Sequence, residues 1–214
     1  MRRTAAVLLS LCGLLSAMTL TTTAASASSS GAGESPAAAG WRVVDTELLN
    51  ELLVEDGLAP LDESADEPQE VPYAIESVRN GLVVASEQRL AEPYTGLLRA
   101  RSATWSGSWE LFDIYWDDTR GTVSLRSNAN GLYVAAERNY TGAASGVLRA
   151  RSESIGGWER FVLWYDETTG RFSFESRAIG LFVATELNAT GTLQNALRAR
   201  SDWINGSWEE FNLY

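Results

Sequence analysis

The chain has 214 residues, a formal net charge of −11 and 17 basic residues, all of which are arginine. It has no histidine, and its one cysteine is Cys12. Because the chain has no histidine and no cysteine after Cys12, Ser–His–Asp and Cys–His catalysis are excluded there, and so are the usual zinc or copper ligands. Because an acidic chain lacks the basic surface that nucleic acid or an anionic membrane needs, we expect neither as a partner. We likewise expect no cofactor and no metal.

Residues 1–27 have the parts of a secretory signal peptide. Arg2 and Arg3 provide the positive start, residues 5–20 are apolar, and the small residues at 25–27 offer a cleavage site. The apolar stretch is short for a membrane span, although a retained membrane anchor is the alternative. We therefore expect a secreted, extracellular protein that has no membrane attachment after cleavage.

Residues 28–70 form an acidic leader that we predict to be flexible apart from one helix. The segment carries eleven acidic residues and one arginine. The predicted helix covers 45–56, with Asp45 as N-cap and Gly57 as C-cap. Because a helix of about three turns is marginal alone, its apolar stripe needs a surface. That stripe either packs back on the chain's own domain or docks onto a partner or a second copy, and its members are Leu48, Leu49, Leu52 and Leu53.

From residue 71 onward the chain repeats itself three times, over 71–119, 120–169 and 170–214. Each repeat holds the motif L-R-A-R, at 98–101, 148–151 and 197–200, followed by G-x-W-E-x-F. A strand, a glycine turn, a second strand and a variable loop precede the motif in every copy. The turn between the first two strands reads Asn-Gly at 80–81 and 130–131 but Ile-Gly at 179–180. Because only the glycine is present in all three copies, we predict that the turn needs the positive φ that glycine adopts easily.

The predicted fold class is all-β, with four short strands in each repeat. Twelve strands in three equivalent units fit a single β-trefoil, a closed barrel capped by three hairpins, and closure removes exposed sheet edges. A β-propeller uses similar units, but three blades are too few to close one. The short amphipathic helix and the acidic linker of the leader would precede this trefoil in the sequence.

The motifs resemble those of the fascin-like branch of β-trefoils. The resemblance is carried by G-L-Y-V-A-A-E at 131–137, by L-R-A-R and by G-x-W-E-x-F, and it covers about two-thirds of the chain. Fascins bundle actin through several tandem trefoils with basic surfaces. This chain has one predicted trefoil, no lysine and a negative net charge, so it departs from them. Secreted bacterial members of this branch are often found beside glycan-degrading domains, which implies carbohydrate binding. A fascin-type structural or protein-interaction module, docking through the 45–56 helix, is the alternative.

The residues repeated in all three copies are predicted to be structural. We expect the repeated tryptophan and phenylalanine to fill the barrel, and Glu110, Glu159 and Glu209 to pair with outward-facing arginines of L-R-A-R. A pair of catalytic carboxylates needs two different environments, whereas threefold repetition provides equivalent ones. The sequence therefore predicts a protein that is not an enzyme. The structural set is Trp109, Phe112, Trp158, Phe161, Trp208 and Phe211.

Ligand specificity is expected to come from residues that differ between the repeats. A sugar site needs an aromatic face and a planar polar partner, and Tyr94 with Glu92 and Tyr140 with Asn139 supply both at short range. These loops could also be ordinary solvated connections. Up to three weak loop sites would act together through multivalency. The candidate ligand-binding residues are Glu92, Tyr94, Trp105, Asn139, Tyr140, Asn188, Gln194 and Trp203.

Overall fold

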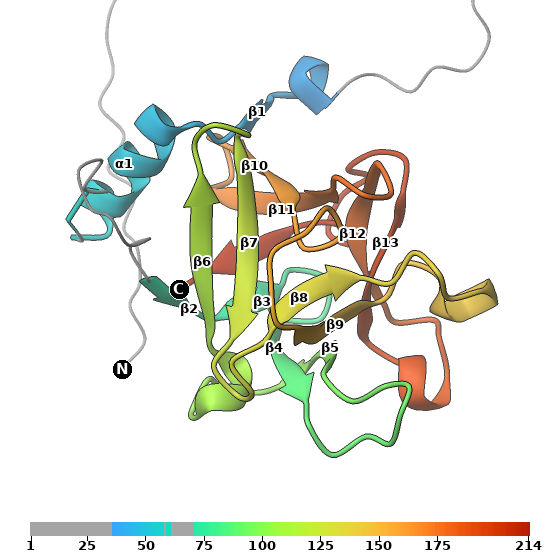
Figure 1. The fold of residues 1–214 in the computed structure, drawn as a ribbon. Coiled ribbons are helices and arrows are strands. Elements are labelled where there is room, and N and C mark those ends of the chain that lie inside the picture. Colours follow the sequence, from blue (N-terminus) through green and yellow to red (C-terminus); the bar gives the residue numbers. More distant parts are fainter. Residues whose placement is uncertain (1–35, 58, 61–70) are drawn as a thin grey trace, which may run out of the picture. The chain divides into compact units, whose positions relative to one another are not determined.

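The computed structural model describes residues 36–57, 59–60 and 71–214 (Figure 1). The predicted signal peptide over 1–27 lies outside the described residues, as do 28–35, 58 and 61–70 of the leader. The described chain is mostly β-strand, with α1 (Thr46–Glu55) and the short 3-10 helices η1 (Pro36–Ala39), η2 (Ser108–Glu110), η3 (Gly142–Ala144) and η4 (Gly191–Leu193). The strands are β1 (Trp41–Val43), β2 (Val71–Tyr73), β3 (Ile75–Ser77), β4 (Leu82–Glu87), β5 (Leu97–Ser102), β6 (Phe112–Asp117), β7 (Thr122–Ser127), β8 (Tyr133–Ala136), β9 (Leu148–Ser152), β10 (Phe161–Asp166), β11 (Arg171–Ser176), β12 (Leu181–Glu186), β13 (Ala196–Ser201) and β14 (Phe211–Leu213).

The first and fourth strands of the three repeats pair in a ring. Each fourth strand is antiparallel to the first strand of the next repeat, in the pairs β6–β7, β10–β11 and β14–β3. Within each repeat the first and fourth strands also touch, in the pairs β2–β6, β7–β10 and β11–β14. Because β2 and β3 are two halves of one strand separated at Ala74, these six pairings close a barrel-like sheet.

The second and third strands form three hairpins, β4–β5, β8–β9 and β12–β13. Each hairpin has a register shift near the start of its first strand, after Val83, Tyr133 and Phe182. The glycine that opens the second strand of each repeat has positive φ, and at Gly180 the value is 73°. The predicted need for a left-handed residue at this turn is thereby confirmed, since Ile179 precedes it without changing the geometry.

The repeated phenylalanines lie at the centre of the core. Phe112, Phe161 and Phe211 are 0% exposed, and each is the first residue of its strand. Leucines and alanines of the L-R-A-R strands pack around them. The prediction that phenylalanine fills the barrel is confirmed.

The prediction that the repeated tryptophans also fill the barrel is wrong. Trp109, Trp158 and Trp208 are only half-buried, because each lies before its strand rather than in it, Trp109 in η2 and the other two in turns. Arginine side chains cover the rings instead. Arg79 lies 4.4 Å from the ring centre of Trp208, and Arg151 lies 5.5 Å from that of Trp158, at cation–π distance.

The leader packs against the barrel through β1 and α1. β1 runs antiparallel to β10, with Trp41 opposite Asp166. The carboxylate of Asp45 caps α1 by accepting a hydrogen bond from the backbone N–H of Leu48 at 2.9 Å. The indole Nε1 of Trp116 in β6 donates to Thr46 at 2.9 Å.

The leucine stripe of α1 is covered by the chain's own barrel. Leu48 and Leu53 are 4% and 3% exposed, and Leu49 and Leu52 pack against the core. The leucine stripe was predicted either to pack on the chain's own domain or to dock onto a partner. In the structure it packs on the chain's own domain. Among the described residues, no helix has both the length and the apolar character that a membrane crossing requires.

Candidate ligand-binding site

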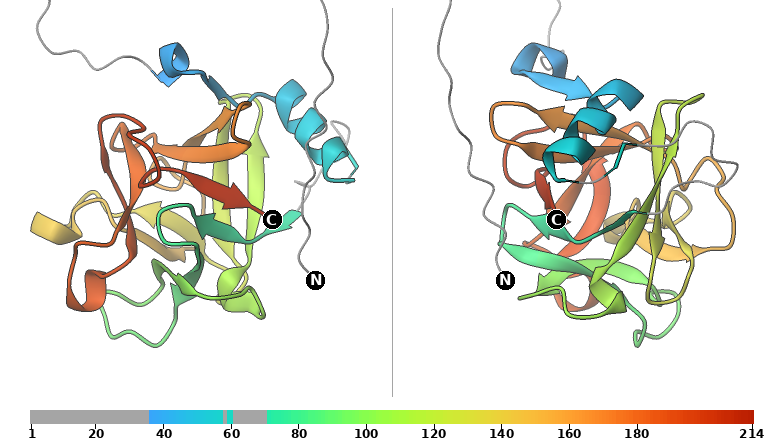
Figure 2. Two further views of the ribbon diagram at one scale, coloured as in Figure 1. Left: turned by 180° about the vertical axis from the view of Figure 1, so that it is seen from behind. Right: turned by 90° about the vertical axis from the view of Figure 1, so that its left-hand side faces the viewer.

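The three variable loops meet around the pseudo-threefold axis of the hairpins. The third strands contact one another there, with Leu97 opposite Arg149 in the β5–β9 pair and Ala196 opposite Arg99 in the β13–β5 pair. Loops 88–96, 138–146 and 187–195 lie on the side of the barrel away from α1 (Figure 2). A small second core lies under them, made of Leu97, Val147 and Ala196 with Leu90, Tyr94, Tyr140 and Leu193 packed against it.

Close backbone contacts fix where each loop joins the next repeat. The carbonyl oxygen of Gly146 accepts a hydrogen bond from Ala199 N–H at 2.8 Å, and Gly96 does the same for Ala150 at 2.8 Å. A Cβ atom on Gly146 would stand 2.3 Å from the carbonyl oxygen of Ala199, and its φ is 81°. Glycine is therefore required at this joint for both space and conformation.

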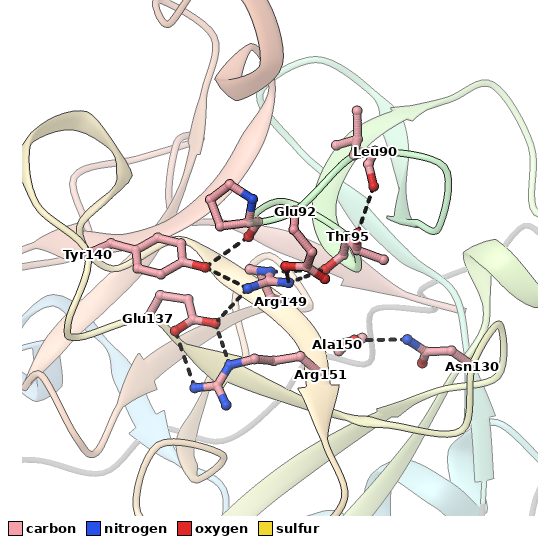
Figure 3. Close-up of polar contacts among 10 residues, drawn as sticks. Leu90, Glu92, Thr95, Asn130, Glu137, Tyr140, Arg149, Ala150 and Arg151 are labelled. Carbon is pink, nitrogen blue, oxygen red and sulfur yellow. Dashed lines mark hydrogen bonds and ion pairs between the residues drawn. The ribbon is translucent and has the colours of Figure 1, made fainter.

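Arg149 holds the loops of the first two repeats together (Figure 3). Its side chain is only 6% exposed. It donates to the carbonyl oxygen of Thr95 at 2.7 and 2.9 Å and to the hydroxyl of Tyr140 at 2.6 Å, and its Nη2 lies 3.1 Å from Glu92. The hydroxyl of Tyr140 in turn donates to the carbonyl oxygen of Pro93 at 2.8 Å. The polar atoms of Glu92 and Tyr140 are thus engaged in joining two repeats.

The predicted tyrosine sites are correspondingly filled by the chain itself. The rings of Tyr94 and Tyr140 pack edge to face with centres 6.5 Å apart, above the second core. The structure brings Glu92, Tyr94 and Tyr140 together. It leaves Asn139, Asn188 and Gln194 exposed, and it is the main-chain oxygen of Gln194 that accepts a hydrogen bond, from Arg99 at 2.8 Å.

The predicted ion pairs between the arginines and the glutamate of G-x-W-E are wrong. The arginines of L-R-A-R pair instead with a glutamate of the same repeat that ends the second strand, at Glu87 and Glu186, or directly follows it, at Glu137. The hydrogen bond with Glu137, at 2.5 Å, raises the pKa of Arg151. The sequence carried a signal for this pairing, because the glutamate and the first arginine are 12 residues apart in every repeat.

The glutamate of G-x-W-E closes the gap between the third and fourth strands. Glu209 is 3% exposed, and its carboxylate accepts from the Ser201 hydroxyl at 2.6 Å and from the Asn205 backbone N–H at 3.1 Å. Glu110 accepts from Ser102, and Glu159 accepts from the backbone of Gly156. These carboxylates shape the gap loops rather than bracing the outside of the barrel.

The gap of the third repeat contains a cavity of about 340 Å³. Trp203 lies at this cavity with 45% of its surface exposed. Arg200 is engaged by Glu186 at 2.7 Å, and Glu209 by the loop. Within the described residues, no hydrogen bond or ion pair is made by the side chains of Asp202, Trp203 or Asn205. The full lining is Arg200, Ser201, Asp202, Trp203, Asn205, Trp208 and Glu209.

This cavity combines an open aromatic face with an uncommitted carboxylate and carboxamide. Of the predicted ligand-binding residues, Trp203 is the one that the structure places at the cavity. Asp202 and Asn205 were missed by the sequence prediction. A signal for them was present, because only the third gap places tryptophan beside both an acidic residue and asparagine. No group of three or more Asp or Glu side chains arranged for a metal ion occurs in the described part of the chain.

No protein-family model matches the chain, and no curated protein matches it. Solved structures with a similar backbone are β-trefoil proteins. The designed threefold-symmetric protein ThreeFoil is 17% identical, with a TM-score of 0.53 over 66% of this chain and 96% of that one. A ricin B-like lectin from Macrolepiota procera, in complex with lactose, is 18% identical, with a TM-score of 0.50 over 70% of this chain and 98% of the lectin.

A third similar structure belongs to a longer enzyme. The endo-β-galactosidase from Clostridium perfringens that releases GlcNAcα1-4Gal is 14% identical, with a TM-score of 0.51. The match covers 66% of this chain but only 31% of that enzyme. Identities this low establish the fold and leave function to the site. The comparisons therefore show that this chain has a β-trefoil fold.

Proposed function

We propose that the chain is a secreted, non-catalytic carbohydrate-binding protein. In this proposal residues 1–27 are a signal peptide, 28–70 a leader, and 71–214 a single β-trefoil of the fascin-like branch. The observation that carries the binding function is the cavity of the third repeat, where the exposed Trp203 stands beside Asp202 and Asn205.

The chemistry of the cavity matches what a sugar ring presents. The apolar C–H face of a pyranose stacks on an indole, and its ring hydroxyls bond to planar carboxylate and carboxamide groups. Asp202 can accept from two hydroxyls, while Asn205 can both donate and accept. Because the arginine at the cavity is already paired with Glu186, the lining offers no spare positive charge. The ligand class is therefore a neutral glycan rather than an acidic one.

Turnover is not part of the proposed function. A glycosidase needs two carboxyl groups with separate acid and base roles. Glu209 is committed to two hydrogen bonds that hold the loop, which leaves Asp202 as the one uncommitted carboxylate in the lining. The lectin among the similar structures supports binding at the level of the fold.

The sites expected in the variable loops are replaced in this proposal by the gap of the third repeat. A protein partner docking through α1 stays a prediction. Such a partner would have to contact the outer face of the helix, which carries Glu47, Glu51 and the exposed Val54, since the leucines are covered.

Affinity electrophoresis of the full chain in gels containing neutral polysaccharides tests the proposal. Hydroxyethylcellulose, laminarin, galactomannan and glycol chitin would be compared with polygalacturonate. We expect retardation in at least one neutral gel and none in polygalacturonate. Trp203→Ala should weaken binding by about tenfold or more, equivalent to about 1.4 kcal/mol.

Gln194→Ala is the matched control, because Gln194 is an exposed residue of a variable loop. Its mobility should equal that of the unchanged chain. If no neutral polysaccharide retards the chain, or if Trp203→Ala binds as well as the unchanged chain, the proposal is contradicted.

A further inference from the structure

A second exposed aromatic surface lies away from the cavity. The rings of Trp105 and Tyr214 are stacked, with centres 5.2 Å apart and planes inclined by 11°. They are 43% and 47% exposed. Among the described residues, they and Trp203 are the large aromatic side chains that remain this open to solvent.

Backbone hydrogen bonds fix the Tyr214 side of the stack to the barrel. Tyr214 exchanges two backbone hydrogen bonds with Ala74, at 2.9 and 3.0 Å, at the junction of the first and third repeats. Its partner Trp105 comes from the gap between β5 and β6. Two segments that are far apart in sequence thus build one stacked aromatic pair, in which each ring covers one face of the other.

Polar groups stand at the edge of this surface. One oxygen of Glu76 accepts from the side-chain amide of Asn212 at 3.0 Å and from the hydroxyl of Tyr214 at 3.5 Å. Burial, and then the charge of Glu76, raise the pKa of Tyr214, so its hydroxyl stays a donor. Both hydrogen bonds go to Oε1, and a carboxylate has about four acceptor positions, so Oε2 can accept from a ligand hydroxyl.

A purely structural role explains the stack less well. The position of Trp105 corresponds to Ile155 and Ile204 in the other repeats, and both are half-buried aliphatic residues. Barrel closure therefore does not require an indole at this position. An exposed indole gains free energy when another apolar surface covers it, at roughly 25 cal/mol per Å².

We infer that the Trp105–Tyr214 stack is a second binding site for a neutral glycan. One sugar ring would stack on an outer ring face of the aromatic pair while its hydroxyls bond to Glu76 and Asn212. The inference rests on the proposed function, because it assigns the same ligand class to a second place. Since the two sites belong to different gaps, one molecule would hold a polysaccharide at two points and gain affinity through effective concentration.

Isothermal titration calorimetry with neutral hexasaccharides tests the second site. Cellohexaose, laminarihexaose, mannohexaose and chitohexaose would be titrated into the full chain, into Trp105→Ala, into Trp203→Ala and into the double variant. We expect two equivalents of the bound sugar per unchanged chain, one in each single variant and none in the double variant. Trp105→Phe keeps an aromatic face and should retain the second equivalent, and thermal unfolding would verify that each variant is folded.

The outcomes separate the second site from the proposed function. If Trp105→Ala keeps the stoichiometry of the unchanged chain while Trp203→Ala abolishes binding, the second site is overturned and the cavity stands. If Trp203→Ala binds as the unchanged chain does while Trp105→Ala loses an equivalent, the cavity is overturned and the stack stands. If the unchanged chain binds none of the four sugars, both are overturned.

Discussion

At the scale of single residues, equivalent positions of the three repeats differ in how deeply their side chains are buried. The first arginine of L-R-A-R is 6% exposed in the second repeat, as Arg149, but 19% exposed as Arg99 and 23% as Arg198. The difference comes from the loops, because only the first two loops supply Glu92 and Tyr140 to cover it. Identical motifs therefore do not predict identical energetics.

Removing the buried arginine should be costly. Arg149→Ala leaves the carbonyl oxygen of Thr95 without its two hydrogen bonds and removes one of the two arginine partners of the buried Glu137, which keeps Arg151. Breaking a buried pair costs about 3–5 kcal/mol. Arg200→Ala, which removes an exposed partner of Glu186, should cost about 0–1 kcal/mol. Urea unfolding of the two variants measures the difference. Equal losses of unfolding free energy would show that the loops do not depend on Arg149.

At the scale of elements, the leader is part of the folded domain. The pattern of leucines predicted a helix but could not say which surface covers it, because periodicity identifies an apolar face and not its partner. The structure gives the partner: β1 extends the sheet beside β10, and α1 lies on the core that contains Phe112 and Phe161.

Shortening a leucine of α1 should destabilise the whole barrel. Leu48→Ala removes a side chain that is 4% exposed, and a buried Leu→Ala change costs about 2–5 kcal/mol. Val54→Ala on the same helix is the control, since Val54 is 58% exposed and surface changes stay within about 0.5 kcal/mol. Thermal and urea unfolding would report both. A Leu48→Ala chain as stable as Val54→Ala would mean that the helix is not packed on the core in solution.

At the scale of the whole molecule, the threefold repetition was sufficient to predict a β-trefoil. The order of the strands in each repeat, the positive-φ glycine at Gly180 and the central phenylalanines all followed from the repeated pattern. The partners of charged groups did not, because the twelve-residue Glu–Arg spacing competes in the sequence with the nearer glutamate of G-x-W-E. The tryptophans were misplaced for a related reason: the strand begins at the phenylalanine, three residues after them.

The binding residues were harder to predict than the fold. Loop residues that differ between repeats seemed the natural place for specificity, yet Glu92 and Tyr140 are occupied by Arg149. Whether a variable side chain is free for a ligand depends on which neighbouring repeat meets it. The contact of Glu92 with Arg149 and that of Tyr140 with Pro93 join residues 57 and 47 positions apart, and no local pattern contains them.

The most direct test of the account is an NMR titration of the full chain with the neutral hexasaccharide that binds best, observed at the tryptophan indole N–H signals. The signal lost in Trp203→Phe identifies Trp203. We predict that this signal shifts in a saturable way as sugar is added, because the ring stacks on that indole. A titration in which binding is saturable but the Trp203 signal stays in place would contradict the central claim.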